Sequence, residues 1–194
     1  IKIIGDLLFQ PDEGYGNILS GGSEANITAL WSIRNNFRKN NLTNLSDYEI
    51  LAPSTIHVSI DKAADLLNLK LRKIRVDQNY QMDINELEST ISNKTIAVTA
   101  IAGTTILGTV DPIKEIAKLC NDYNIPIHVD AAFGGLVLPF IKYKDIFDFR
   151  VDAVNSITVD IHKMGRVPIP GGGILWRNKD LIKNISFTLP YLSK

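Results

Sequence analysis

The feature that most constrains the fold is an alternation of short apolar, β-branched runs with segments of helical periodicity. Residues 95–101 (TIAVTAI) are almost entirely apolar or β-branched, which is typical of a strand buried on both faces of a parallel sheet. Residues 23–38 instead place Ile27, Leu30, Ile33 and Phe37 on one helical face. This alternation predicts an α/β fold, with a mostly parallel sheet and helices on both faces.

The remaining expected elements continue the alternation. Strands are expected at residues 49–53, 71–76, 126–130, 151–159 and 172–176, and helices at residues 61–69, after Asp83, and after Asp111. Asp83 with Glu86 three residues later is a helix-start signature. Pro112 is expected at the first helical position, which proline favours. In a sheet of this kind, ligands bind beyond the carboxyl ends of the strands.

Composition excludes several classes of protein. The 194 residues carry 21 basic and 21 acidic side chains, so we expect no nucleic-acid partner. No apolar run reaches the roughly 18–20 residues of a membrane span, so no membrane partner is expected either. Cys120, the single cysteine, suits the reducing cytoplasm. Because the chain starts at Ile1 rather than Met, we expect one domain, residues 1–194, from a longer subunit.

Small, polar and ionisable residues gather where the expected strands end. The segments are SGGSEAN (20–26), STIHVS (54–59), AGTTILG (102–108), DAAFGG (130–135) and DIHKMG (160–165). All but the first follow an expected strand, and the first leads into an expected helix. Together they indicate a ligand site at one sheet edge more strongly than any single motif does.

Taken one at a time, the motifs have simpler explanations. The turn at residues 20–23 could bind phosphate at a helix start, but an ordinary serine cap explains it equally well. Asp130 could pair with a ring nitrogen, orient a base, bind a metal or merely cap a loop. His128 shares its strand face and either supports Asp130 or is a satisfied core histidine. The chain's three histidines lack metal-ligand spacing, so no metal is expected.

Lys163 follows His162 at the end of an expected buried strand. Burying an ammonium group is costly unless it is paired or chemically transformed. An isolated loop lysine usually extends to solvent, whereas a site lysine can form a Schiff base with an aldehyde. With the turn at residues 20–23, Asp130 and a ring at His57, Lys163 meets the demands of pyridoxal phosphate.

The segments SGGSEAN, HVSIDKA, GTTILGT, HVDAAFGG and SITVDIHKMG resemble the group II pyridoxal-phosphate-dependent amino-acid decarboxylases. HVDAAFGGLVLPF and HKMG…PIPGGGIL resemble most the archaeal L-tyrosine/L-aspartate decarboxylase branch. The resemblance implies the large domain of the fold-type I pyridoxal-phosphate transferases, with the C-terminal small domain absent from this chain. It also implies a cytoplasmic homodimer that shares its site between subunits.

The resemblance implies three catalytic residues, each with its own role. Lys163 would form the internal aldimine, Asp130 would pair with the pyridine nitrogen, and His57 would stack on the ring and take part in proton transfer. The residues that it assigns to cofactor binding are Gly22, Ser23, His57, Thr105, Asp130, Ala132, His162 and Lys163.

The other cofactor-binding residues have narrower implied roles. Gly22 and Ser23 would bind the phosphate, with His162 nearby. Thr105 would lie near the cofactor's phenolic oxygen or the substrate carboxylate, and Ala132 would pack against the face of the ring opposite His57.

Two positions depart from the commonest family residues. Many members have Asn where this chain has Asp160, and a carboxylate is repelled by a phosphate unless it points elsewhere. The role of Asp160 is therefore left open. Asn155 stands where Asp commonly precedes the serine, here Ser156, which would lie in the second layer of the pocket.

The implied reaction is α-decarboxylation of an L-amino acid of the tyrosine, aspartate or glutamate class, giving an amine and carbon dioxide. One alternative is a carbon–carbon lyase of the sphingosine-phosphate lyase type, which shares the His-Lys-x-Gly turn. Another is a truncated, non-catalytic fragment that serves as a binding module. The catalytic-loop tyrosine and the substrate-carboxylate arginine of the family are expected outside this chain.

Overall fold

The computed structural model describes residues 1–40, 44–143 and 146–187. The helices are α1 (Lys2–Leu7), α2 (Gly22–Asn40), α3 (Val58–Leu66), α4 (Ile84–Thr90) and α5 (Ile113–Asp122). The strands are β1 (Tyr15–Leu19), β2 (Glu49–Pro53), β3 (Lys70–Ile74), β4 (Thr95–Ile101), β5 (Ile127–Asp130), β6 (Val154–Val159) and β7 (Gly172–Trp176). Short 3₁₀ turns lie at Leu45–Asp47, Gly134–Leu136, Leu138–Phe140 and Lys179–Asn184.

The strands form one seven-stranded sheet in the order β1-β7-β6-β5-β4-β2-β3. The pairs between β6 and β3 are all parallel, and β7 runs antiparallel to both of its neighbours. The mostly parallel sheet is therefore confirmed. The helix α1 and the edge strand β1 are not among the expected elements, since Gly16 and Asn17 weaken the strand pattern of β1.

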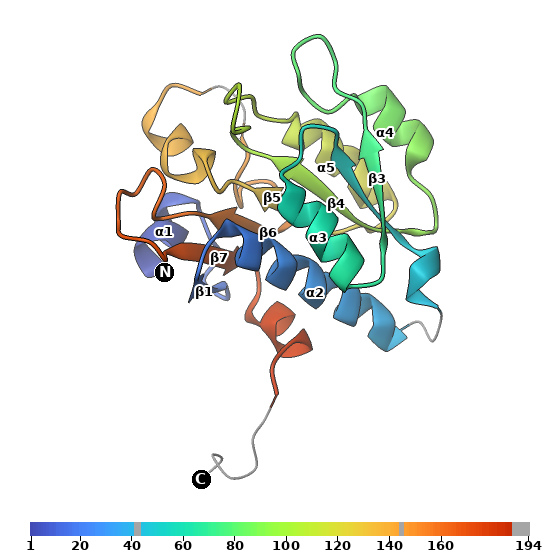
Figure 1. Cartoon of the computed structure of the whole chain (residues 1–194), viewed down its shortest axis with the longest axis horizontal. Helices are drawn as coiled ribbons and strands as arrows, with labels where there is room; N and C mark the ends of the chain where they lie inside the picture. Colours follow the sequence, from blue (N-terminus) through green and yellow to red (C-terminus); the bar gives the residue numbers. More distant parts are fainter. Residues whose placement is uncertain (41–43, 144–145, 188–194) are drawn as a thin grey trace.

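Helices cover both faces of the sheet, as expected (Figure 1). On β2, Ile50 and Ala52 pack in the cluster that includes residues of α2 and α3, whereas Leu51 belongs to the cluster of α4 and α5. All five β2 residues are buried. This burial on both faces explains why its sequence, EILAP, shows an apolar run rather than alternation.

Side-chain caps set two of the helix starts. The Asp83 carboxylate accepts hydrogen bonds from the backbone N–H groups of Asn85 and Glu86, so the expected start of α4 is confirmed. The Glu86 carboxylate accepts from the backbone N–H and Nε of Arg75, not from Asp83. At α3 the His57 side chain is the N-cap, so this helix begins three residues before the expected residue 61.

The start of α5 differs from the expectation by one residue. Pro112 is the N-cap of α5 and Ile113 its first residue. Asp111 turns inward, where its carboxylate accepts hydrogen bonds from the backbone N–H of Met82 (2.8 Å) and of Ile101 (2.7 Å). Burial raises the pKa of Asp111 to about 6. Asp111 therefore ties the end of β4 to the loop before α4.

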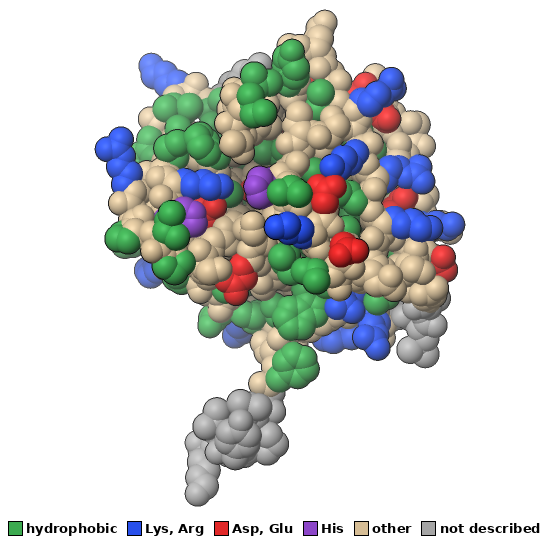
Figure 2. Space-filling model, viewed as in Figure 1, with side chains coloured by type: hydrophobic (Ala, Val, Ile, Leu, Met, Phe, Trp, Pro, Cys, Tyr) green, Lys and Arg blue, Asp and Glu red, His purple; other side chains and the backbone are tan. Residues whose placement is uncertain are grey.

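The surface shows no segregation of charge on the face in Figure 2, where acidic and basic side chains are interspersed. Among the described residues, no helix combines the length and apolarity needed to cross a membrane. No group of three or more His, Cys, Asp or Glu side chains in the described ranges is placed to hold a metal ion.

Candidate active site

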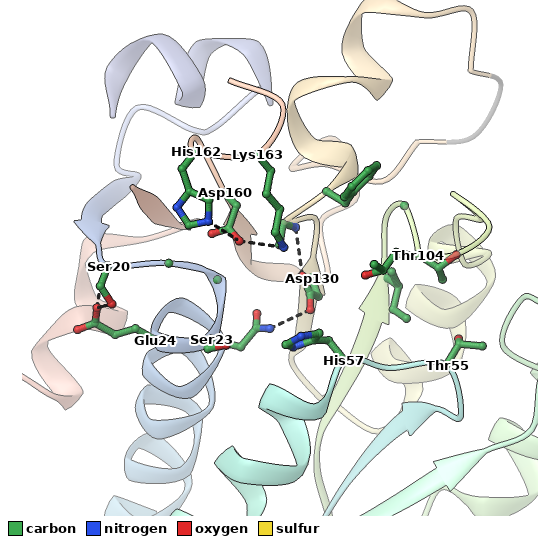
Figure 3. A pocket seen from close by; sticks show the side chains of 18 residues that line it. Ser20, Ser23, Glu24, Thr55, His57, Thr104, Asp130, Asp160, His162 and Lys163 are labelled. Atoms are coloured by element: carbon green, nitrogen blue, oxygen red, sulfur yellow. Dashed lines mark hydrogen bonds and ion pairs between the residues drawn. The ribbon is translucent and has the colours of Figure 1, made fainter. Parts of the chain in front are cut away.

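A cavity of about 380 Å³ lies at the carboxyl ends of β2, β4, β5 and β6, beside the start of α2 (Figure 3). Residues from all five polar segments line it. Every residue that the family resemblance assigns to cofactor binding is among them: Gly22, Ser23, His57, Thr105, Asp130, Ala132, His162 and Lys163. The parallel strands explain the convergence, because they end at the same sheet edge.

The turn before α2 presents backbone N–H groups at the cavity. The backbone N–H groups in the first turn of α2 have no intrahelical acceptor. A Cβ on Gly22 would lie 2.8 Å from Asp160 Oδ2 and 3.1 Å from Ala132 Cβ, so this position has no space for a side chain. The hydroxyl and backbone N–H of Ser20 both donate to Glu24 Oε2, each at 2.7 Å. Both donors of Ser20 therefore bond to Glu24 at the start of the helix.

The first residue of β7, Gly172, packs closely against the backbone of the turn before α2. A Cβ on Gly172 would collide with the Gly21 backbone and would lie 2.8 Å from Asp160 Oδ1. The glycine that opens β7 therefore allows the turn before α2 to lie against the end of β6.

Asp130, at the end of β5, is a buried carboxylate with neutral hydrogen-bond donors. The residue is 6% exposed. Oδ1 accepts from the backbone N–H of Ala132 at 3.1 Å, and Oδ2 accepts from Asn26 Nδ2 at 2.8 Å. Desolvation raises the pKa of Asp130, opposed by these two hydrogen bonds and by the positive charge of Lys163. A cationic N–H group in the cavity would compensate this carboxylate.

A histidine supports Asp130 from behind through Asn26. The fully buried His128 contacts Asn26 Oδ1 through Nε2 (2.9 Å) and Ser156 Oγ through Nδ1 (2.8 Å). Burial lowers the pKa of His128 to about 3. The satisfied-core interpretation of His128 is confirmed, and its connection to Asp130 is indirect. Ser156 lies beneath His128, away from the cavity lining.

Asn26, which is 1% exposed, is a site residue absent from the expected set. One signal was present: Asn26 precedes Leu30 and Ile33 by four and seven residues, so it lies on the buried face of α2. A polar residue on such a face requires a buried partner.

Lys163 lies in the turn after β6, not in the strand, and its side chain is 35% exposed. The expected position after the strand is confirmed, because β6 ends at Val159. Lys163 Nζ lies 3.0 Å from Asp160 Oδ2, and His162 Nε2 lies 3.7 Å from the same oxygen. The partly exposed Lys163 ammonium group is therefore paired with a buried carboxylate.

His162 and Asp160 complete this cluster. His162 Nδ1 accepts from the backbone N–H of Gly171 at 3.0 Å. Asp160 is 3% exposed, and its Oδ1 atom has no hydrogen-bond partner among the described residues. A buried polar atom of this kind, at the cavity wall, is typical of a site that a ligand completes.

The remaining site residues come from the ends of β2 and β4. Thr105 is exposed at the cavity lining, whereas the neighbouring Thr104 is buried and exchanges a 2.8 Å hydrogen bond with Thr109 Oγ1. His57 lines the cavity while its Nδ1 atom accepts from the backbone N–H of Ser59. The structure thus places these side chains together, and their roles remain predictions.

These residues fit pyridoxal phosphate. The glycine turn and free N–H groups at α2 suit a phosphate. The buried carboxylate of Asp130 suits a protonated ring nitrogen, and the Lys163 amine suits an aldehyde.

Comparison with known proteins agrees with a pyridoxal-phosphate site. The family described as the pyridoxal-dependent decarboxylase conserved domain matches residues 1–194. A Methanothermobacter thermautotrophicus protein named "probable L-tyrosine/L-aspartate decarboxylase" is 42% identical over 100% of this chain and 53% of its own length. The L-aspartate/L-glutamate decarboxylase of Pyrococcus horikoshii is 45% identical over 100% of this chain and 50% of its own length. The chain spans about half the length of these curated relatives.

Solved structures show the same fold. The sphingosine-1-phosphate lyase of Burkholderia pseudomallei superposes with a TM-score of 0.90 at 26% identity, over 97% of this chain and 46% of that one. The glutamate decarboxylase of Lactobacillus brevis gives a TM-score of 0.87 at 27% identity, over 99% and 47%. The fold is therefore that of the fold-type I pyridoxal-phosphate enzymes, and the chain belongs to the pyridoxal-dependent decarboxylase family.

Proposed function

We propose that the full-length protein removes the α-carboxylate of an L-amino acid as carbon dioxide and releases the corresponding amine. The observation that carries this proposal is that Asp130 and Lys163 line one cavity at the N-terminus of α2. The names of the curated relatives, which are amino-acid decarboxylases, support the reaction type. In this proposal residues 1–194 are the cofactor-binding large domain.

The residues that would hold pyridoxal phosphate come from five segments of the cavity wall. Gly22 and Ser23 would bind the phosphate through the α2 backbone, beside His162. Lys163 would bond to the aldehyde carbon through Nζ, and Asp130 would face the ring nitrogen. The rest of the proposed contact set is His57 and Ala132 on the two faces of the ring and Thr105 at its edge.

When bound, pyridoxal phosphate supplies an electron sink for the pair released as the bond from Cα to the carboxylate breaks. Asp130 would hold a proton at the ring nitrogen, because its buried carboxylate has no other cation in hydrogen-bond contact within the described chain. Lys163 would hold the cofactor before substrate arrives and would accept and return protons at Nζ. His57 would orient the reacting groups from one side of the ring.

The proposed substrates are the amino acids named for the relatives, tyrosine, aspartate and glutamate. We further propose a cytoplasmic homodimer with a shared site. The residues that select the substrate side chain would lie outside residues 1–194.

A second candidate is a carbon–carbon lyase, because the sphingosine-1-phosphate lyase, with a TM-score of 0.90 at 26% identity, resembles this chain about as closely as the glutamate decarboxylase does. The products separate the two reactions, because a decarboxylase releases an amine and carbon dioxide, whereas such a lyase releases an aldehyde. A non-catalytic fragment would produce neither.

The test uses the full-length protein loaded with cofactor and mass spectrometry of its products from the common amino acids. We expect an amine product in the wild type and a loss of turnover of at least about a thousandfold in Lys163→Ala. Lys118→Ala, which changes an exposed lysine on α5, is the matched control. Retained turnover in Lys163→Ala, an aldehyde product, or a colourless cofactor-saturated protein would overturn the proposal.

A further inference from the structure

A continuous line of hydrogen bonds connects Asp130 to His57. Asn26 Nδ2 lies 2.8 Å from Asp130 Oδ2 and 2.9 Å from Ser59 Oγ. Ser59 Oγ in turn lies 2.9 Å from His57 Nδ1. Asn26 is 1% exposed and Ser59 is fully buried. Figure 3 shows His57 and Asp130 in the cavity wall.

The direction of each hydrogen bond follows from the chemistry of the groups. The ionised Asp130 carboxylate only accepts, so the amide nitrogen of Asn26 must face it. On the other side, Asn26 Oδ1 accepts from His128 Nε2, whose ring takes its other hydrogen bond at Nδ1 from Ser156. The orientation of the Asn26 amide is therefore fixed on both sides.

That orientation determines what Ser59 can do. The second hydrogen of the Asn26 amide occupies a lone pair of Ser59 Oγ. The Ser59 hydroxyl hydrogen is then free to point to His57 Nδ1. The same nitrogen also accepts the backbone N–H of Ser59 at 3.2 Å, as the cap of α3. Both neighbours of His57 Nδ1 are donors, so the neutral ring carries its proton on Nε2.

We propose that Asn26 is a positioning residue that links Asp130 to the tautomer of His57. By donating to both Asp130 and Ser59, its amide directs a relay of hydrogen bonds that leaves Nδ1 of His57 unprotonated. His57 then presents an Nε2–H donor to the cavity. A neutral imidazole of this kind acts as a hydrogen-bond donor to a bound ligand rather than as a base at that atom.

The relay does not depend on which reaction the protein catalyses. Only the consequence for a bound ligand rests on the proposed function. A measurement of the His57 tautomer therefore tests the relay, whereas a measurement of turnover tests the proposed function, and either one can be contradicted without the other.

The test is ¹⁵N-histidine NMR of the full-length, cofactor-loaded protein, with His57 assigned through its loss in His57→Gln. We expect the wild type to show Nδ1 as an unprotonated nitrogen and Nε2 as a protonated one. Asn26→Asp keeps the size of the side chain but replaces a donor with an acceptor. Ser59 would then donate toward residue 26 instead of toward His57. We expect the His57 Nδ1 resonance to shift toward that of a more weakly hydrogen-bonded nitrogen, because only the backbone N–H of Ser59 still donates to it.

Asn155→Asp is the matched control, because it makes the same change beside β5, where the Asn155 side chain accepts from the backbone N–H of Ile127. We expect its His57 spectrum to equal that of the wild type. If Asn26→Asp does not fold, Ser59→Ala removes the hydroxyl donor while the backbone N–H stays. Its His57 Nδ1 resonance should then shift toward that of an unbonded nitrogen. An Nδ1–H tautomer in the wild type, or an unchanged resonance in the folded variant, would overturn the relay.

Discussion

Asp160 Oδ2 lies 3.0 Å from Lys163 Nζ, and the same oxygen lies against the α2 N-terminus at Gly22. Asp160 is therefore the charge partner of the lysine and also a negative group beside the proposed phosphate position. Since the Lys163 side chain is about a third exposed, the pair contributes only about 1 kcal/mol. The sequence left the role of Asp160 open, and the structure places this carboxylate between Lys163 and the N-terminus of α2.

Replacing Asp160 by Asn should increase the affinity of the cofactor-free, full-length protein for inorganic phosphate. The change removes a carboxylate that repels an anion at the start of α2. A relief of about 1 kcal/mol corresponds to roughly fivefold tighter binding. Isothermal titration calorimetry measures the effect. Asp152→Asn removes the same charge from an exposed residue at the opposite edge of the sheet and should change nothing. Unchanged or weaker binding in Asp160→Asn would contradict this account.

Adding a methyl group at Gly22 should weaken cofactor binding by about tenfold or more. The new Cβ would lie 2.8 Å from Asp160 Oδ2 and 3.1 Å from Ala132 Cβ, so the helix start must move. Ala favours helix over Gly by up to about 1 kcal/mol, so loss of the helix would not explain the result. Gly173→Ala, whose Cβ would have its nearest neighbours at 3.6 Å, should bind cofactor normally. Cofactor titration followed by absorbance distinguishes the two variants.

Asp130→Asn should reduce turnover by roughly a hundredfold or more while the phosphate-binding turn is unchanged. The variant keeps the size of the side chain but loses the buried charge that would face the ring nitrogen, a loss of about 3 kcal/mol. Asp130→Glu, which keeps the charge, should recover part of the activity. Steady-state kinetics at saturating cofactor measures both, and wild-type turnover in Asp130→Asn would rule out the role proposed for this residue.

His128 should make the protein less stable in weak acid. Its pKa is about 3 in the folded chain because of burial, whereas an unfolded histidine titrates near 6.5. Below about pH 6.5 the unfolded state therefore binds a proton that the folded state does not, and stability falls with pH until about pH 3. Between pH 7 and pH 5 this single group should cost about 2 kcal/mol.

His128→Gln is the comparison, because an amide can still donate to Asn26 and accept from Ser156. Urea unfolding at several pH values should show a smaller loss of unfolding free energy on acidification in this variant than in the wild type. Asp111, whose raised pKa acts in the opposite direction between about pH 6 and pH 4, is present in both proteins and cancels. Equal pH slopes would mean that His128 is protonated in the folded state.

Much of the fold could be predicted from local patterns. The strand at residues 172–176 and the buried strand at residues 95–101 were placed within their observed bounds, because apolar runs of this length report burial directly. The cap at Asp83 could also be predicted, because it involves only residues within three positions of Asp83. The predictions were wrong or incomplete where a group distant in the sequence determines the local structure. Asp111 turns inward to backbone groups of two other segments instead of starting α5. The segment β1 becomes a strand by pairing with β7.

By itself, the sequence determined the layered α/β architecture, the sheet edge that carries the site, and the residue types gathered there. Only the tertiary structure decided how those residues are connected. Asn26 contacts Asp130 across 104 positions and His128 across 102, and Lys163 is paired with Asp160 rather than buried alone. Periodicity reports which face of an element is buried, but a polar side chain on that face takes its partner from whichever strand the fold brings beside it.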